Sequence, residues 1–120
     1  MFDGTWIPVT AVMNGEELPA DCLQTTRVLF TGEKYLATAG DIRDYGTFKW
    51  DATISPPTVT ITGLEGPNAG RTMLTIYQLD GDRLTVCYDL QGVAFPTEFK
   101  AEAGSGHYLV TYRRMKLVTG

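Results

Sequence analysis

The sequence has little of what nucleic-acid-binding and membrane proteins need. Its 10 lysines and arginines stand against 14 aspartates and glutamates, which gives a net charge of -4. A nucleic-acid interface requires clustered cations, and we interpret the one short basic segment, Arg113, Arg114 and Lys116, as a solvated strand end. No apolar run reaches the roughly 18 residues of a membrane-spanning helix. We therefore expect neither nucleic-acid binding nor membrane insertion.

Residues that carry chemistry are also scarce. His107 is the sole histidine, and it follows a Gly104-Ser105-Gly106 turn that explains its surroundings without catalysis. The usual zinc site needs several histidines and cysteines close together, which this chain lacks. Asp80 and Asp82 flank Gly81 as a hairpin turn requires, so we do not assign them to a cation. We expect no catalytic residue, no metal and no cofactor, and hence a protein that is not an enzyme.

Cys22 and Cys87 are the two cysteines of the chain. Cys87 lies in an alternating apolar run and Cys22 in a polar connection, which favours two free thiols. A disulfide between them is the alternative if the domain is secreted. The first residues lack the basic start and apolar stretch of a signal peptide, so the chain as written is not expected to be exported. A removed leader would leave the same sequence, and the compartment stays open.

What the sequence does have is β-type alternation along most of its length. Short runs of alternating polarity are separated by glycine, proline, asparagine and aspartate, which is typical of a barrel or a sandwich. Pro8 lacks an amide hydrogen and predicts a bulge or an unpaired edge in the first strand. A single short helical turn is expected within 16–24. We expect strands at 6–13, 25–31, 34–39, 47–54, 58–62, 72–79, 83–88 and 107–116, with a further short strand at 97–101.

These elements predict one all-β domain spanning residues 1–120. No predicted helix is long enough to cover a sheet face, so the sheet must bury its apolar side against itself. An antiparallel barrel of about eight strands does this and also removes the exposed edges. A sandwich of two small sheets is the alternative.

The first and last predicted strands resemble those of lipocalins. Gly4-Thr5-Trp6 opens the first strand, and a basic pair lies on the last strand. In lipocalins a Gly-x-Trp opens the first strand, and an arginine from the final strand lies over the indole, where a guanidinium suits the aromatic face. Adjacent strand residues face opposite ways, so only one of Arg113 and Arg114 can do this. The resemblance implies that Gly4, Trp6 and Arg114 close one end of the barrel.

Nearly the whole chain resembles an uncharacterised lipocalin-like (calycin-type) domain family that is numerous in planctomycete-type bacteria. The resemblance implies a fold, and a shared fold alone does not transfer a function. One position departs from the family pattern: Phe95 stands where an arginine usually precedes the Pro-Thr-Glu-Phe segment, so no anion contact is expected there. The matching stretches are Gly4–Trp6, Gly46–Phe48, Ile76–Leu84, Val86–Cys87, Phe95–Phe99 and Gly104–Gly106.

Aromatic residues on three predicted strands are candidates to line a ligand cavity. Phe48 and Trp50 share a strand face that we expect to point inward with Ala52 and Ile54. Tyr77 and Tyr88 lie on the two strands of the next hairpin. Four such side chains at a barrel mouth would suit a small apolar or amphipathic ligand, although they can equally fill the core. The leading hypothesis is a non-enzymatic barrel that binds such a ligand through Phe48, Trp50, Tyr77 and Tyr88.

The second hypothesis is a protein-interaction module with a packed barrel and functional loops. The loops at 63–70 and 89–96 are the candidates, since loops on a rigid scaffold commonly carry binding residues. Val93, Ala94 and Phe95 form an apolar loop segment that either contacts a partner protein or caps the barrel end. The two hypotheses differ in whether the interior holds an open cavity.

Overall fold

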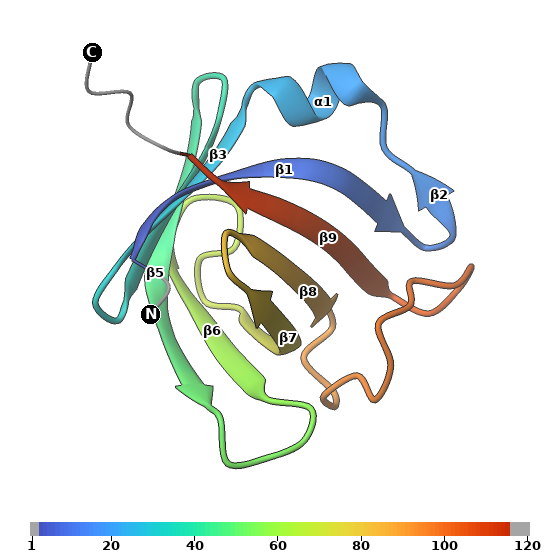
Figure 1. Cartoon of the computed structure of the whole chain (residues 1–120). Helices are drawn as coiled ribbons and strands as arrows, with labels where there is room; N and C mark the ends of the chain where they lie inside the picture. The colour runs from blue at the N-terminus through green and yellow to red at the C-terminus, as the bar shows by residue number, and fades with distance from the viewer. Residues whose placement is uncertain (1–2, 116–120) are drawn as a thin grey trace.

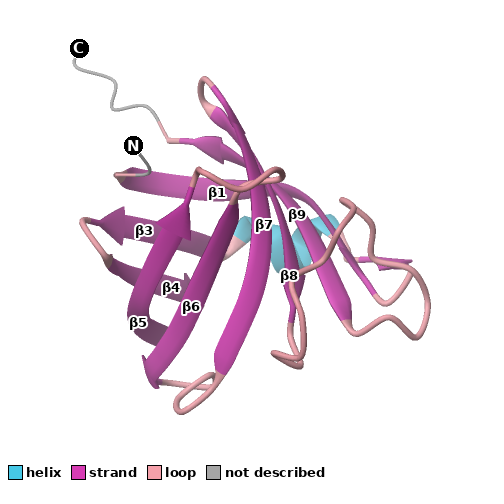
Figure 2. Cartoon of the chain, turned by 90° about the horizontal axis from the view of Figure 1, so that it is seen from below, coloured by secondary structure: helices cyan, strands magenta, loops and turns pink. Residues whose placement is uncertain are grey.

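A computed structural model describes residues 3–115, and its strands form one closed antiparallel sheet (Figures 1 and 2). The sheet closes because β1 (Gly4–Met13) pairs with both β3 (Thr26–Thr31) and β9 (His107–Arg114). The other strands are β2 (Glu16–Glu17), β4 (Lys34–Ala39), β5 (Ile42–Asp51), β6 (Thr58–Glu65), β7 (Thr72–Asp80) and β8 (Arg83–Asp89). Eight strands form the barrel, and the two-residue β2 is an additional strand that pairs with the end of β1. The predicted all-β barrel is confirmed, and the alternative of two separate sheets is wrong.

The connection between β1 and β3 contains the one helix found within residues 3–115. This helix, α1 (Ala20–Gln24), begins after Pro19 and lies outside the barrel against β1 (Figure 1). It falls inside the segment where a helical turn was expected. The buried side chain of Leu23 faces β1 and covers part of its outer surface. The structure describes the backbone of Cys22 in this helix, and its side chain lies outside the described part.

Pro8 produces the predicted irregularity in β1. Pro8 is opposite Tyr112, and Thr10 is opposite the adjacent Thr111, so Val9 is an additional residue in the ladder. Proline cannot donate a ladder hydrogen bond, and a bulge removes the need for one. The bulge also shifts the alternation, so that Ala11 is buried beyond it.

Trp6 is fully buried at one end of the barrel, where β1 meets β9. Trp6 and Arg114 are cross-strand partners, and the Arg114 guanidinium lies 4.7 Å from the centre of the indole ring. The Asp82 carboxylate lies 3.7 Å from Arg114 Nε on the other side. Gly4 has a φ of 127°, which side chains rarely adopt, and it passes close to the aliphatic part of Arg114. Arg113 faces outward and is exposed, so Arg114 is the residue that stacks on Trp6.

Two predicted strands are wrong in their extent. β5 covers 42–51 rather than 47–54, because Asp51 accepts hydrogen bonds from the backbone N–H and the hydroxyl of Thr53 and so forms a turn. Ala52 and Ile54 therefore lie outside the sheet and are exposed, instead of facing the interior with Phe48. Residues 97–101 form no strand and belong to a long loop. The last predicted strand extended to 116, and its final residue is outside the described part.

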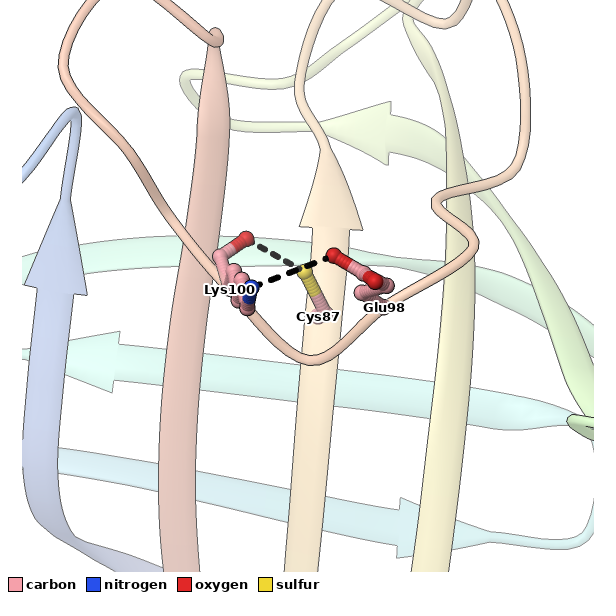
Figure 3. Close-up of polar contacts among 3 residues, drawn as sticks. All are labelled: Cys87, Glu98 and Lys100. Atoms are coloured by element: carbon pink, nitrogen blue, oxygen red, sulfur yellow. Dashed lines mark hydrogen bonds and ion pairs between the residues drawn. The ribbon is translucent and has the colours of Figure 1, made fainter.

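That long loop, residues 90–106, covers the outer face of β8. Figure 3 shows Glu98 and Lys100 of the loop beside Cys87 of the strand. Cys87 is a free thiol with no exposed surface, and its Sγ lies 3.3 Å from the Lys100 carbonyl oxygen, to which it donates. Burial raises the pKa of this thiol. The exposed Glu98–Lys100 ion pair, at 3.4 Å, contributes little to the attachment of the loop.

Asp89 orders the first part of the loop at its base. The Asp89 carboxylate accepts hydrogen bonds from the backbone N–H groups of Gln91, Val93 and Ala94 at 2.9–3.1 Å. Burial alone would raise the pKa of Asp89, but these three bonds outweigh it and lower the pKa below its ordinary value. One side chain thereby satisfies three backbone donors that the turn leaves without sheet partners.

Replacing Trp6 with alanine tests the closure of the barrel. Trp6→Ala removes a fully buried ring and its contact with Arg114. We expect the free energy of unfolding to fall by about 3–5 kcal/mol, as for other large core truncations. Urea denaturation measures it, with Trp50→Ala as control because Trp50 is 38% exposed. A loss below about 1 kcal/mol for Trp6→Ala would contradict a closing role.

Replacing Asp89 with asparagine tests the attachment of the loop. Asp89→Asn should lower the free energy of unfolding at pH 7 by about 1–3 kcal/mol, because a neutral amide replaces the charged acceptor. The lowered pKa of Asp89 stabilises the fold above the unfolded-state pKa of about 4, and this contribution disappears as the pH falls through the folded-state value. The difference between wild type and variant should therefore shrink in acid.

Urea denaturation at pH 7 and in acid measures this difference, with the exposed Asp80→Asn as control. Iodoacetamide modification of Cys87, followed by mass spectrometry of its peptide, should become faster in Asp89→Asn because the covering loop opens more often. An unchanged modification rate would show that Asp89 does not hold the loop.

Candidate functional site

The interior of the barrel is packed at one end and open at the other. Near the Trp6 end the remaining space is about 20 Å³, which is close to the volume needed for a single water. At the opposite end the side chains leave a cavity of about 180 Å³. The two spaces share Phe30, Ile61 and Tyr88 as walls. The barrel therefore combines a filled core with one cavity.

The four residues predicted to bind a ligand do not surround this cavity. Phe48 and Tyr77 lie in the packed half, where they fill the core. Trp50 is outside the core at 38% exposure, with its ring 5.5 Å from that of Phe48. Tyr88 alone among them lines the cavity. Trp50 lies on the same strand face as Phe48, but β5 ends one residue later, so Trp50 lies beyond the packed core and outside the cavity.

Four tyrosines form the aromatic wall of the cavity: Tyr35 from β4, Tyr88 from β8, and Tyr108 and Tyr112 from β9. The hydroxyls of Tyr88 and Tyr112 are hydrogen-bonded at 3.0 Å. The rings of Tyr88 and Tyr108 are stacked with their centres 5.5 Å apart. Burial raises the pKa of each of these phenols, so all four are neutral at physiological pH.

A buried carboxylate, Asp44, lies in the same wall. Asp44 is on β5, opposite Ala37 of β4, and its Oδ2 accepts a hydrogen bond of 2.6 Å from Nδ2 of Asn68. The Asn68 backbone N–H donates to Oδ1 at 3.4 Å. Asn68 reaches this position because its loop lies directly against the sheet. A side chain on Gly63 would collide with the Asn68 carbonyl, and one on Gly66 would collide with Arg43 and Asp44.

Tyr35 is the one cavity tyrosine whose hydroxyl is buried and, within the described residues, has no hydrogen-bond partner. Tyr35 is 6% exposed, so its hydroxyl is shielded from bulk solvent. Burial and, as the smaller cause, the negative charge of Asp44 together raise the pKa of Tyr35 to about 12. Tyr35 and Asp44 lie on the paired strands β4 and β5 and line the same cavity, and the Tyr35 hydroxyl makes no hydrogen bond with another described residue.

The chain was compared with protein-family models, curated proteins and solved structures. None of them matches. The cavity must therefore be understood from its own residues. Among the side chains that the structure describes, which exclude that of Cys22, no three from histidine, cysteine, aspartate or glutamate are grouped closely enough to hold a metal ion. The described helix is also too short to cross a membrane.

The sequence analysis missed Tyr35, Asp44, Asn68, Tyr108 and Tyr112. A signal existed for Asp44, because it is separated by an even number of residues from the inward-facing Phe48 and so lies on the same strand face. A charged residue on an otherwise apolar face is unusual and is a reasonable indication of function. Asn68 gave no such signal, because its position depends on how the loop folds.

Paired tyrosine substitutions test the polar groups of the cavity. Tyr35→Phe removes a buried hydroxyl that has no partner, so the protein should be unchanged or more stable by up to about 1 kcal/mol. Tyr112→Phe breaks the bond to Tyr88 and should cost about 1 kcal/mol. Thermal and urea unfolding of both variants measure this contrast. A clear destabilisation by Tyr35→Phe would show that its hydroxyl is already bonded in the free protein.

Proposed function

We propose that this chain is a non-enzymatic, lipocalin-like barrel that binds a small amphipathic ligand in the tyrosine-lined cavity. The observation that supports this most strongly is the Tyr35 hydroxyl, which is buried, faces the cavity and has no partner among the described residues. Leaving such a group unsatisfied costs free energy. A bound molecule with a polar group at this point would recover that cost.

The composition of the cavity supports an amphipathic ligand. Its apolar walls include Val28, Ile61, Met73 and Leu90, while Asp44 and Tyr35 supply polar atoms at one place. An apolar body with one polar head matches this arrangement. The described lining residues offer hydroxyl, amide and carboxylate groups that can bind a polar head group.

We also propose that the chain belongs to the uncharacterised lipocalin-like domain family that its sequence resembles. The contact between Trp6 and Arg114 supports this assignment, because it has the same parts and position as the lipocalin signature. The closed barrel is consistent with it. The proposal concerns descent and fold, and the ligand is argued from the cavity alone.

The second candidate function is protein binding through the long loop. Val93 is 77% exposed and Phe95 is also exposed, so the apolar segment does not cap the barrel end. Asp89 holds the backbone of this segment in a defined conformation. An ordered loop that presents apolar side chains to solvent is suited to a protein partner.

Native mass spectrometry of the protein purified from its own host tests ligand binding. We expect additional mass that denaturation removes. Ala37→Leu should reduce it, because Ala37 lines the cavity opposite Asp44 and a larger side chain would occupy the space. The control is Ala52→Leu, which adds the same atoms at an exposed position outside the sheet. Bare protein in every sample would contradict ligand binding and favour the loop.

A further inference from the structure

Asp44 is the one charged residue among the described residues that line the cavity. Asp44 is 8% exposed and lines the cavity, and none of the arginine or lysine side chains that the structure describes forms an ion pair with it. Its two hydrogen-bond donors, from Asn68, are both neutral. Buried carboxylates are rarely left without a compensating positive charge. A bound cation would supply the compensating charge.

The hydroxyl of Tyr35 is placed to share that cation. It lines the same cavity as Asp44, from the neighbouring strand β4, and it has no hydrogen-bond partner of its own within the described residues. A neutral phenol oxygen accepts a hydrogen bond as readily as it donates one. A single nitrogen bearing several hydrogens can donate to the Asp44 carboxylate and to Tyr35 Oη together.

The aromatic wall suits the same charge. The faces of tyrosine rings attract cations, and this attraction is strongest where water is excluded. The four cavity tyrosines are neutral, so they add no second charge and leave Asp44 as the only ionised group among the described lining residues. A protonated amine would be held by the Asp44 carboxylate and the Tyr35 hydroxyl in a cavity with an aromatic wall. An anion would be repelled by Asp44.

The volume limits the size of the occupant. An apolar cavity of about 150 Å³ in another protein holds one benzene molecule. The cavity here, at about 180 Å³, has space for one ring and a short substituent. This is smaller than the cavities that accept larger, drug-sized ligands.

We propose that the ligand is a small organic ammonium: a primary or methylated amine with an apolar body about the size of one ring, bound through Asp44 and Tyr35. This rests on the proposed function, because it names the chemical class that the same cavity accepts. The head group lies at the β4–β5 wall, where both residues are found, and the apolar body lies against Ile61, Met73 and Leu90.

Three probes of nearly equal shape and different charge test this proposal. Benzylamine, benzyl alcohol and benzoate are titrated into the intact protein at pH 7, with binding followed by calorimetry and by NMR shifts of the cavity residues. Benzylamine, which is protonated at this pH, should bind at least about tenfold more tightly than benzyl alcohol. Benzoate should not bind. This comparison uses wild-type protein and does not depend on the folding of any variant.

Variants assign the preference to the named residues. Asp44→Asn should reduce benzylamine affinity to that of benzyl alcohol and leave benzyl alcohol binding unchanged. Tyr35→Phe should weaken benzylamine by a smaller factor. The control is Asp80→Asn, which changes the net charge equally at an exposed turn and should have no effect. Thermal unfolding confirms that each variant is folded.

The failures of the two proposals are distinguishable. Equal binding of benzylamine and benzyl alcohol would overturn the ammonium proposal and leave ligand binding in the cavity standing. Tighter binding of benzoate would overturn it as well. If none of the three probes shifts the cavity residues at millimolar concentration, both the ammonium proposal and the proposed ligand-binding function are contradicted.

Discussion

β1 is hydrogen-bonded on one edge to β3 and on the other to β9, and this double pairing holds the two ends of the sheet together. The register of that closure places Trp6 opposite Arg114 and positions the bulge at Pro8. Because β1 fills the gap between β3 and β9, the sheet closes on itself and leaves no free edge there. The apolar faces of all eight barrel strands are therefore directed at one another. The packed end, the cavity and the covering loop all depend on this closure.

The packed end and the cavity differ in what their side chains gain from burial. Around Trp6 the apolar side chains fill the interior, so each contributes dispersion contacts and loses contact with water. At the other end the wall contains phenols, a carboxylate and an amide, which lose hydration and only partly recover it through the Tyr88–Tyr112 and Asp44–Asn68 bonds. Such a cavity is less favourable for stability than an apolar core, and its retention is understandable if it binds something.

Local patterns predicted the barrel well and the cavity poorly. The hairpin turns, the bulge at Pro8 and most strands follow from alternation and from glycine, proline and aspartate, whose effects act over a few residues. The start of β5 was missed because Asp44 and Gly46 interrupt the apolar face that Phe48 continues. Its end was missed because the turn at Asp51 depends on a side-chain bond to Thr53. Residues 97–101 alternate like a strand, yet they bind the outside of the barrel through Lys100.

The separation of the packed end from the cavity has a consequence for the evolution of the sequence. Residues that hold the barrel together, such as Trp6, Phe48 and Tyr77, belong to one half, and those that face the cavity, such as Tyr35, Asp44 and Tyr108, belong mostly to the other. Substitutions in the second half alter the shape and charge of the cavity while the first half retains its packing. Under the proposed ligand-binding function, homologous barrels could acquire different ligand preferences through changes at cavity positions such as Asp44 and Tyr108, which lie outside the set of buried core residues around Trp6 and Phe48.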